Sequence, residues 1–271
     1  MSESLFVVDG DVYEATELAT GPWSPDALHG GPVSALLAYL LEAMSSGEGM
    51  FPARLTIELL RPVGHQPMVV ALEVVRPGKK VRVCEARLRL RDDDSSYGFL
   101  ARGVLQQIRH DEIELPADHR SVDPQESAPS NPDDEPVSAG RFIEGEPTAF
   151  HNTAVEHRSP SEFFIQLGPA FDWIRVVPDL LPGVPLTPLA RVAAAADFGN
   201  GVSATLPIPP YLFVNPDLTI HLNRLPVDEW VGLDARTRVG DAGVGYAEAA
   251  LFDRHGRIGR SVQSLLIDRL S

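Results

Sequence analysis

The first half of the chain alternates apolar and polar positions in a way that predicts one helix followed by four strands. Residues 29–44, HGGPVSALLAYLLEAM, hold a proline near their start and then an apolar run of good helix formers. Nearly every side of that helix is apolar, so we expect other structure to surround it. Strands are expected after it at residues 53–62, 68–77, 80–91 and 96–109.

The second half repeats this order. Strand-like stretches at 162–168 and 171–178 precede an alanine-rich helix at 187–198, and four further strands are expected at 215–226, 230–239, 244–253 and 257–270. The stretch RLTIELLRP stands opposite DLTIHLNRLP, and ARGVLQQIR stands opposite GRSVQSLLIDR. The sequence therefore predicts a duplicated unit. The expected fold class is α+β, with antiparallel strands curled around each helix and the edges of the two sheets joined into one.

The segment between the halves is rich in Pro, Asp, Glu and Ser and poor in large apolar residues. Such a composition cannot offset the entropy of ordering the chain by burial, which is typical of a linker or a loosely attached surface loop. We therefore predict a first repeat over residues 1–110, a linker over 111–145 and a second repeat over 146–271.

Charge and composition exclude several classes of partner. The 271 residues carry a net charge of -15, whereas nucleic acid and anionic membrane surfaces require a basic footprint. The single cysteine, Cys84, can form neither an internal disulfide nor a thiolate metal cage. The sequence has no secretory leader, and its apolar runs are too short to span a bilayer. We therefore expect a soluble protein of the cytoplasm.

One acid lies in an unusual position. In LARVAAAADFGNGVS, residues 189–203, four alanines run directly into Asp197. A simple interpretation is a helix end with a glycine cap and a solvated carboxylate. The alternative is a carboxylate among apolar neighbours, which is a candidate general base.

The motifs in this order resemble those of the double-hotdog acyl-CoA thioesterases of the thioesterase II kind. The matching stretches are HGG at 29–31, AAADFGNG at 194–201, NPDLTIHLNR at 215–224 and SVQSLLI at 261–267. The resemblance covers almost the whole chain apart from the linker. It implies a double hotdog, in which two tandem repeats each wrap an antiparallel sheet around a long helix.

In single-hotdog relatives, HGG opens the helix and a carboxylate follows about two and a half turns later. The two halves of this chain divide that pattern, since the first half has HGG but Ala38 at the place of the acid. The second half has Asp197 but Pro188 at the place of the histidine. We therefore expect one working site, built across the pseudo-twofold interface.

The resemblance implies a catalytic set of an aspartate, a hydroxyl residue on the next strand and a glutamine on the last strand. Asp197 and Gln263 match the first and third members. The second falls on Asn215, with Thr219 four residues later as a substitute hydroxyl. Asn215 precedes a proline and also suits a turn, and Gln263 also suits an exposed strand position.

The substrate-binding residues expected are His29, Gly30 and Gly31, with backbone N–H groups at the helix start as oxyanion donors. The same HGG stretch also suits a tight turn. No metal or redox cofactor is required for this chemistry. The alternating arginines of residues 82–91 could bind phosphates, although such a pattern is more typical of a solvated sheet face.

The predicted function is hydrolysis of acyl-CoA thioesters to a free acid and coenzyme A, within fatty acid metabolism. One alternative is a non-catalytic acyl-CoA or lipid sensor of the same fold. A lower-ranked alternative is an enoyl-CoA hydratase, which relies on an aspartate and a histidine close together after the helix, whereas here His221 is distant from Asp197. A homodimer is considered, although no residue indicates its interface.

Overall fold

The computed structural model of the protein describes residues 3–44, 49–93, 95, 98–111, 126–138, 147–160 and 167–269. The helices are α1 (Gly30–Ala43), α2 (Phe150–Thr153), α3 (Pro188–Ala196) and α4 (Gly199–Val202), with a 3-10 helix η1 (Glu17–Ala19). The strands of the first half are β1 (Phe6–Asp9), β2 (Val12–Ala15), β3 (Met50–Leu59), β4 (Met68–Arg76), β5 (Val81–Leu90) and β6 (Phe99–Arg109). Those that follow are β7 (Val137–Ser138), β8 (Val155–Arg158), β9 (Ala170–Val176), β10 (Tyr211–Val214), β11 (Asp217–Leu222), β12 (Val231–Val239), β13 (Val244–Asp253) and β14 (Gly256–Arg269).

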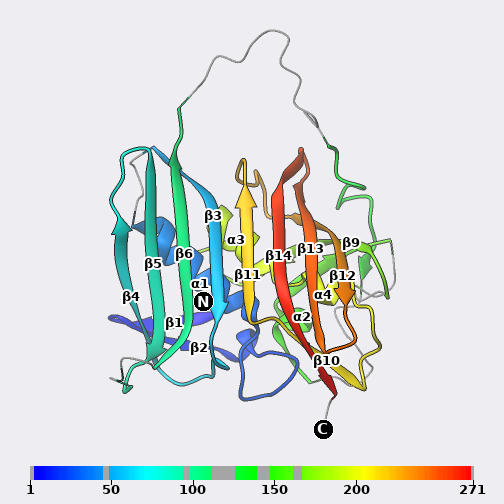
Figure 1. Ribbon diagram of the computed structural model, residues 1–271, viewed down its shortest axis with the longest axis horizontal. Helices are drawn as coiled ribbons and strands as arrows, with labels where there is room; N and C mark the ends of the chain where they lie inside the picture. Colours follow the sequence, from blue (N-terminus) through cyan, green and yellow to red (C-terminus); the bar gives the residue numbers. More distant parts are fainter. Residues whose placement is uncertain are drawn as a thin grey trace.

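Within the described ranges, fourteen strands form a single sheet whose pairings between neighbouring strands are antiparallel (Figure 1). Outward from the middle, one side runs β3, β6, β5, β4, β2 and β1. The other side runs β11, β14, β13, β12, β9 and β8, which is the same order of the corresponding strands. This confirms two tandem copies of one unit and the α+β double-hotdog fold class.

The two copies meet at the pair β3 and β11. In this antiparallel pair Thr56 lies opposite Thr219, and their hydroxyl oxygens are 3.3 Å apart. Outward from them, Thr56 pairs with Val104 of β6, and Thr219 pairs with Val262 of β14. A pseudo-twofold axis therefore passes between the two threonines, and it relates each residue of one copy to its counterpart in the other.

Helices α1 and α3 lie against each other on one face of the sheet (Figure 1). Every residue of α1 from Gly31 to Ala38 is buried, and α3 is buried at nearly every position. Their apolar side chains join those of both halves of the sheet in one hydrophobic core. The prediction that these helices are surrounded by other structure is thus confirmed, and the alanines of α3 permit the close approach to α1.

The predicted elements agree with the observed ones with two exceptions. The predicted second helix, at 187–198, corresponds to α3, and a further short helix, α4, follows it at Gly199 where none was predicted. The predicted strand at 162–168 lies almost entirely outside the described residues. The hairpin of β1 and β2 turns at Gly10, whose φ of 63° is in the left-handed region that favours glycine.

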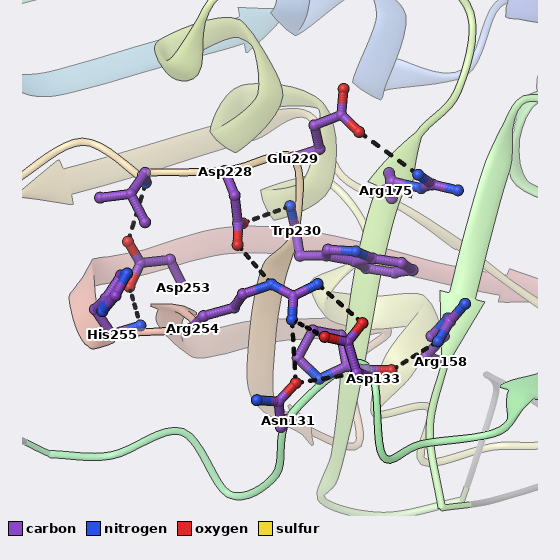
Figure 2. A network of polar contacts seen from close by, with 12 residues as sticks. Asn131, Asp133, Arg158, Arg175, Asp228, Glu229, Trp230, Asp253, Arg254 and His255 are labelled. Carbon is purple, nitrogen blue, oxygen red and sulfur yellow. Dashed lines mark hydrogen bonds and ion pairs between the residues drawn. The ribbon is translucent and has the colours of Figure 1, made fainter.

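Part of the predicted linker packs firmly on the second copy. Residues 126–138 follow the edge of the sheet there, and β7 at their end pairs with β8. Arg254 donates hydrogen bonds to Asn131 at 3.2 Å and to the carboxylate of Asp133 (Figure 2). Trp173 Nε1 donates to Ser130 Oγ at 3.3 Å. This stretch differs from the loose attachment that its composition suggested, because side chains of the second copy satisfy its polar groups.

Candidate active site

His29 is positioned by its place at the start of α1. It occupies the N-cap, and its Nδ1 accepts a hydrogen bond from the Gly31 N–H at 3.0 Å. This satisfies one of the backbone donors that have no partner within the helix. The ring also packs against Phe198 and Phe150, with centroids 4.9 and 5.1 Å away. The imidazole is therefore held rigidly, with 12% of its side chain exposed.

Asp197 lies at the end of α3 and is 3% exposed. Its Oδ1 accepts a hydrogen bond from Asn215 Nδ2 at 2.7 Å, and its Oδ2 lies 2.9 Å from His29 Nδ1. The acid of the second copy thus meets the imidazole of the first where α1 begins and α3 ends. The interpretation of Asp197 as a solvated residue at a helix end is wrong, because two polar partners hold it in the interior.

A proton must lie between His29 and Asp197. Two lone pairs facing each other at 2.9 Å would repel, so either Nδ1 donates its proton to a carboxylate or a neutral carboxyl donates to Nδ1. Nδ1 accepts from the Gly31 N–H only in the second of these arrangements, because a protonated ring nitrogen has no lone pair to offer. The side chains of His29 and Asp197 are therefore in direct hydrogen-bonding contact.

The two glycines after His29 permit this contact. A Cβ on Gly30 would lie 2.7 and 2.8 Å from the two carboxylate oxygens of Asp197. A Cβ on Gly31 would lie 3.0 Å from the carbonyl oxygen of Ala194. The Gly31 N–H is already engaged by His29, so of the two predicted oxyanion donors Gly30 is the better placed, at the wall of the cavity.

A cavity of about 540 Å³ opens beside these groups. Its polar lining includes His29, Asp197 and Asn215. Its apolar walls include Trp23, Leu28, Val33, Leu59, Val63, Phe198, Ile208 and Phe213. An apolar cavity of this size with a few convergent polar groups is typical of a small-molecule site.

A buried polar chain that the sequence analysis did not predict lies behind the cavity wall. His151 lines the cavity, and its carbonyl oxygen lies 3.2 Å from His157 Nε2, which must donate because a carbonyl only accepts. On its other side His157 Nδ1 lies 2.6 Å from Asp172 Oδ2. Burial raises the pKa of Asp172, and the neighbouring His157 opposes that rise. In the sequence, the signal for this hydrogen-bonded chain was the pair of histidines in FHNTAVEHR.

The structure separates the two candidates for the second catalytic position. Asn215 contacts Asp197 and lines the cavity, whereas Thr219 lies on the pseudo-twofold axis against Thr56 and is not part of the cavity lining. The reason is visible in the repeats, because Thr219 is the counterpart of Thr56 in the aligned stretches and serves the junction of the sheets.

Gln263 is buried on β14, close to the chain that follows Asp197. A Cβ on Gly199 would lie 2.9 Å from Gln263 Oε1, so the amide packs on the first turn of α4. Its Nε2 is buried with no hydrogen-bond partner among the described residues. The interpretation of Gln263 as an exposed strand residue is wrong. The structure does not bring it into the cavity lining with Asp197 and Asn215.

The arginines of β5 are occupied within the sheet surface. Arg87 pairs with Glu85 and Glu73, and Arg89 donates to backbone carbonyls, including that of Asp93 at 2.9 Å. This favours the interpretation of a solvated sheet face. Across the described ranges, no group of three or more His, Cys, Asp or Glu side chains is arranged to hold a metal ion. No helix in the described part of the chain is long and apolar enough to cross a membrane.

Comparison with known proteins identifies two matching family models. One, described as the acyl-CoA thioesterase N-terminal domain, matches residues 19–105. The other, described as the acyl-CoA thioesterase C-terminal domain, matches residues 124–267 and so includes the packed stretch at 126–138. No curated protein matches the sequence.

Several solved structures share the fold over nearly the whole chain. A protein assigned as a thioesterase II from Thermobifida fusca is 17% identical, with a TM-score of 0.71 and coverage of 97% of this chain and 95% of that one. A hot dog fold protein from Alicyclobacillus acidocaldarius is 17% identical, with a TM-score of 0.67 and coverage of 98% and 96%. An acyl-CoA thioesterase II from Mycobacterium marinum is 15% identical, with a TM-score of 0.62 and coverage of 97% and 95%. At these identities the likeness is one of fold.

Proposed function

Because the chain belongs to the acyl-CoA thioesterase family and is a thioester hydrolase, we propose that Asp197 activates the attacking water in the cavity between α1 and α3. The observation that supports this most is the burial of its carboxyl group at the cavity wall, with Asn215 on one oxygen and His29 on the other. A group fixed in this way can accept a proton without first reorganising its surroundings.

The proposed reaction has two steps. Asp197 takes a proton from water while the water oxygen attacks the thioester carbonyl carbon, whose oxygen becomes an oxyanion. The Gly30 N–H at the start of α1 stabilises that oxyanion, since the first N–H groups of a helix have no partner within it. The carbonyl then re-forms as the carbon–sulfur bond breaks, and the thiolate of coenzyme A takes up the proton.

Asn215 and Gln263 have supporting roles in this proposal. The Asn215 amide holds Oδ1, and so keeps the carboxylate plane fixed relative to the cavity. A buried amide nitrogen without a partner is costly, so we expect water or substrate to satisfy Gln263 Nε2 when the site is filled. Thr219 has no role in the reaction.

The test is thioester hydrolysis followed with a thiol reagent. Asp197→Asn keeps the shape but loses the base, and we expect kcat to fall by about 10²- to 10⁴-fold while acyl-CoA binding survives. Thr219→Val is the matched control, because Thr219 lies on the axis outside the cavity lining, and its activity should equal that of the wild type. Full activity in Asp197→Asn would refute the proposal.

A second candidate function is hydration of an enoyl thioester, and the contact between His29 and Asp197 favours it. The sequence analysis ranked it low because no histidine follows Asp197 closely, but the structure supplies one from the other copy at 2.9 Å. In such a reaction water gives its hydroxyl to one carbon of the double bond and a proton to the other. Loss of crotonyl-CoA without thiol release would identify a hydratase, whereas release of thiol identifies the hydrolase.

The acyl-CoA substrate class comes with the family. We further propose, from the sequence, a place in fatty acid metabolism and in the cytoplasm. The homodimer stays a prediction, which sedimentation of the purified protein would test.

A further inference from the structure

A second cavity, of about 690 Å³, lies at the opposite end of the contact between the two helices. Its lining includes Glu42 near the end of α1 and Thr187, the N-cap of α3. The first cavity has the reverse arrangement, with the start of α1 and the end of α3. The pseudo-twofold axis therefore relates the two cavities to each other.

The residues at the two cavities correspond one by one. The N-cap of α1 is His29 and that of α3 is Thr187. Asp197 is ten positions after its N-cap, and the position ten after His29 is Tyr39. Both Thr187 and Tyr39 line the second cavity. The structure thus corrects the sequence alignment by one residue, since that alignment placed Ala38 and Pro188 at these positions.

The strand residues of the proposed catalytic set are also replaced. Asn215 lies four positions before Thr219, and Pro52 lies four before Thr56 and lines the second cavity. Gln263 follows Val262, and its counterpart after Val104 is Leu105, which is buried. The second cavity therefore keeps the position of the site but none of its four proposed catalytic groups.

New polar groups line the second cavity in their place. Glu42 lies one helical turn beyond Tyr39, and its carboxyl is hydrogen-bonded to the Thr187 hydroxyl. Gln107, two residues after Leu105 on β6, is buried and lines the cavity together with Asn223. A cavity with such groups in its lining favours a ligand that can hydrogen-bond to them.

We propose that this cavity is a non-catalytic binding seat for the amide-bearing pantetheine arm of coenzyme A or of an acyl thioester. The choice of ligand class depends on the proposed function, because it extends the substrate of the first cavity to its symmetry counterpart. The exposed amide side chain of Asn223 offers both a donor and an acceptor, which matches the amide groups of pantetheine. Gln107 adds a second amide to the lining, and its Oε1 lies 4.0 Å from Cys84 Sγ.

The charges around the cavity favour an uncharged ligand over a phosphate. Arg224 lines the cavity, but its guanidinium is bound to both oxygens of Asp253 and to the carbonyl of Gly256 at 2.8 Å. Burial raises the pKa of Glu42, and the Thr187 hydroxyl opposes that rise. A carboxyl group at the cavity wall disfavours an anionic ligand, because like charges repel.

The test uses pantetheine, which has no thioester and cannot be hydrolysed. In an NMR titration of the wild type, we expect backbone amides around Phe213 and Asn215 and those around Gly49 and Asn223 to shift, as two separate sites. Ala43→Trp fills the second cavity and should abolish only the shifts around Gly49 and Asn223. The matched control is Gly201→Trp. Gly201 lines the first cavity and Ala43 the second, and they lie fourteen positions after the N-caps of α3 and α1, respectively. Gly201→Trp should abolish only the shifts around Phe213 and Asn215.

Two results would overturn the proposal. One is a wild type in which only the first set of amides shifts, and the other is an Ala43→Trp variant that keeps both sets. If Ala43→Trp does not fold, Asn223→Leu decides, since it introduces the counterpart residue Leu60 at an exposed position. It should weaken binding at the second seat about 5- to 10-fold, and an unchanged affinity refutes the seat. Thiol release, measured separately, tests the hydrolase alone.

Discussion

At Asp197 the two carboxylate oxygens have different kinds of partner. Asn215 donates to Oδ1 through an amide, which neither gives up nor accepts a proton at neutral pH. His29 faces Oδ2 through an imidazole nitrogen, which is a donor or an acceptor according to the tautomer of the ring. In the proposed reaction, a proton taken from water therefore reaches a carboxyl group whose Oδ2 contacts His29.

A methyl group at residue 30 should separate these partners. In Gly30→Ala the new Cβ would lie 2.7 and 2.8 Å from the Asp197 oxygens, so the carboxylate must move. We expect kcat to fall by about 10²-fold, because small displacements of reacting groups have effects of that size. The thermal midpoint measured alongside should stay near that of the wild type, since alanine suits a helix start. Unchanged turnover would show that the contact with His29 is not needed.

The sequence left Asp197 open between a solvated helix end and an acid among apolar neighbours, and its burial agrees with the second. It also left the neighbour of Asp197 open between Asn215 and Thr219. The choice depended on which of these two residues faces the end of α3. The alternation of side chains along a strand does not specify this for a residue next to a proline. His151 and His157 were missed for a similar reason. Their positions are set by contacts between segments distant in sequence, which local pattern does not encode.

At the scale of single elements, a partly buried ion pair fixes the loop after β11 to the end of β13. Arg224 contacts both oxygens of Asp253, and the backbone N–H of Val227 donates to the same carboxylate at 3.1 Å. The backbone N–H of His255 also donates to it, at 2.8 Å (Figure 2). Burial acts to raise the pKa of Asp253, but Arg224 and the two N–H groups outweigh it and hold the pKa below its ordinary value of 3.8.

This pair gives a pH dependence of stability with a definite sign. A carboxyl whose pKa is lowered by folding stabilises the folded state above its unfolded pKa, and this contribution is lost as the pH falls through 3.8 toward the lower folded value. We therefore expect Asp253→Asn to lower the thermal midpoint clearly at neutral pH and less at acid pH, where both side chains are neutral. Calorimetry across that range measures the difference.

Asp133→Asn is the matched control for this experiment. Asp133 also pairs with an arginine, Arg254, but its side chain is 67% exposed, whereas that of Asp253 is fully buried. Exposed pairs contribute little, because water and salt screen them. Equal pH profiles for the two variants would contradict the assignment of the acid dependence to Asp253.

At the scale of the molecule, the architecture could be predicted because the two halves of the sequence repeat the same order of elements. Paired stretches such as RLTIELLRP and DLTIHLNRLP gave the order of strands, and the structure places their threonines opposite each other. The packing of residues 126–138 could not be predicted, because its partners, such as Arg254 and Trp173, lie far along the chain. The proposed site likewise combines residues 29 and 197, which no local pattern joins.

The location of the site within one chain predicts the outcome of a mixing experiment. His29→Ala and Asp197→Asn should each hydrolyse acyl-CoA poorly, and an equimolar mixture should be no more active than the two apart. The reason is that α1 and α3 of the same chain share one core, so a half from one molecule cannot pair with a half from another. Recovered activity after mixing would instead place the site between chains.

The contact between Thr56 and Thr219 also bears on the history of the molecule. A residue that meets its own equivalent across an axis is the mark of an isologous interface between two identical subunits. Here that interface has become internal, because one polypeptide provides both sides. After fusion of the two genes, the two copies would no longer have needed identical sequences. One cavity could then specialise in hydrolysis while the symmetry-related cavity acquired different lining residues.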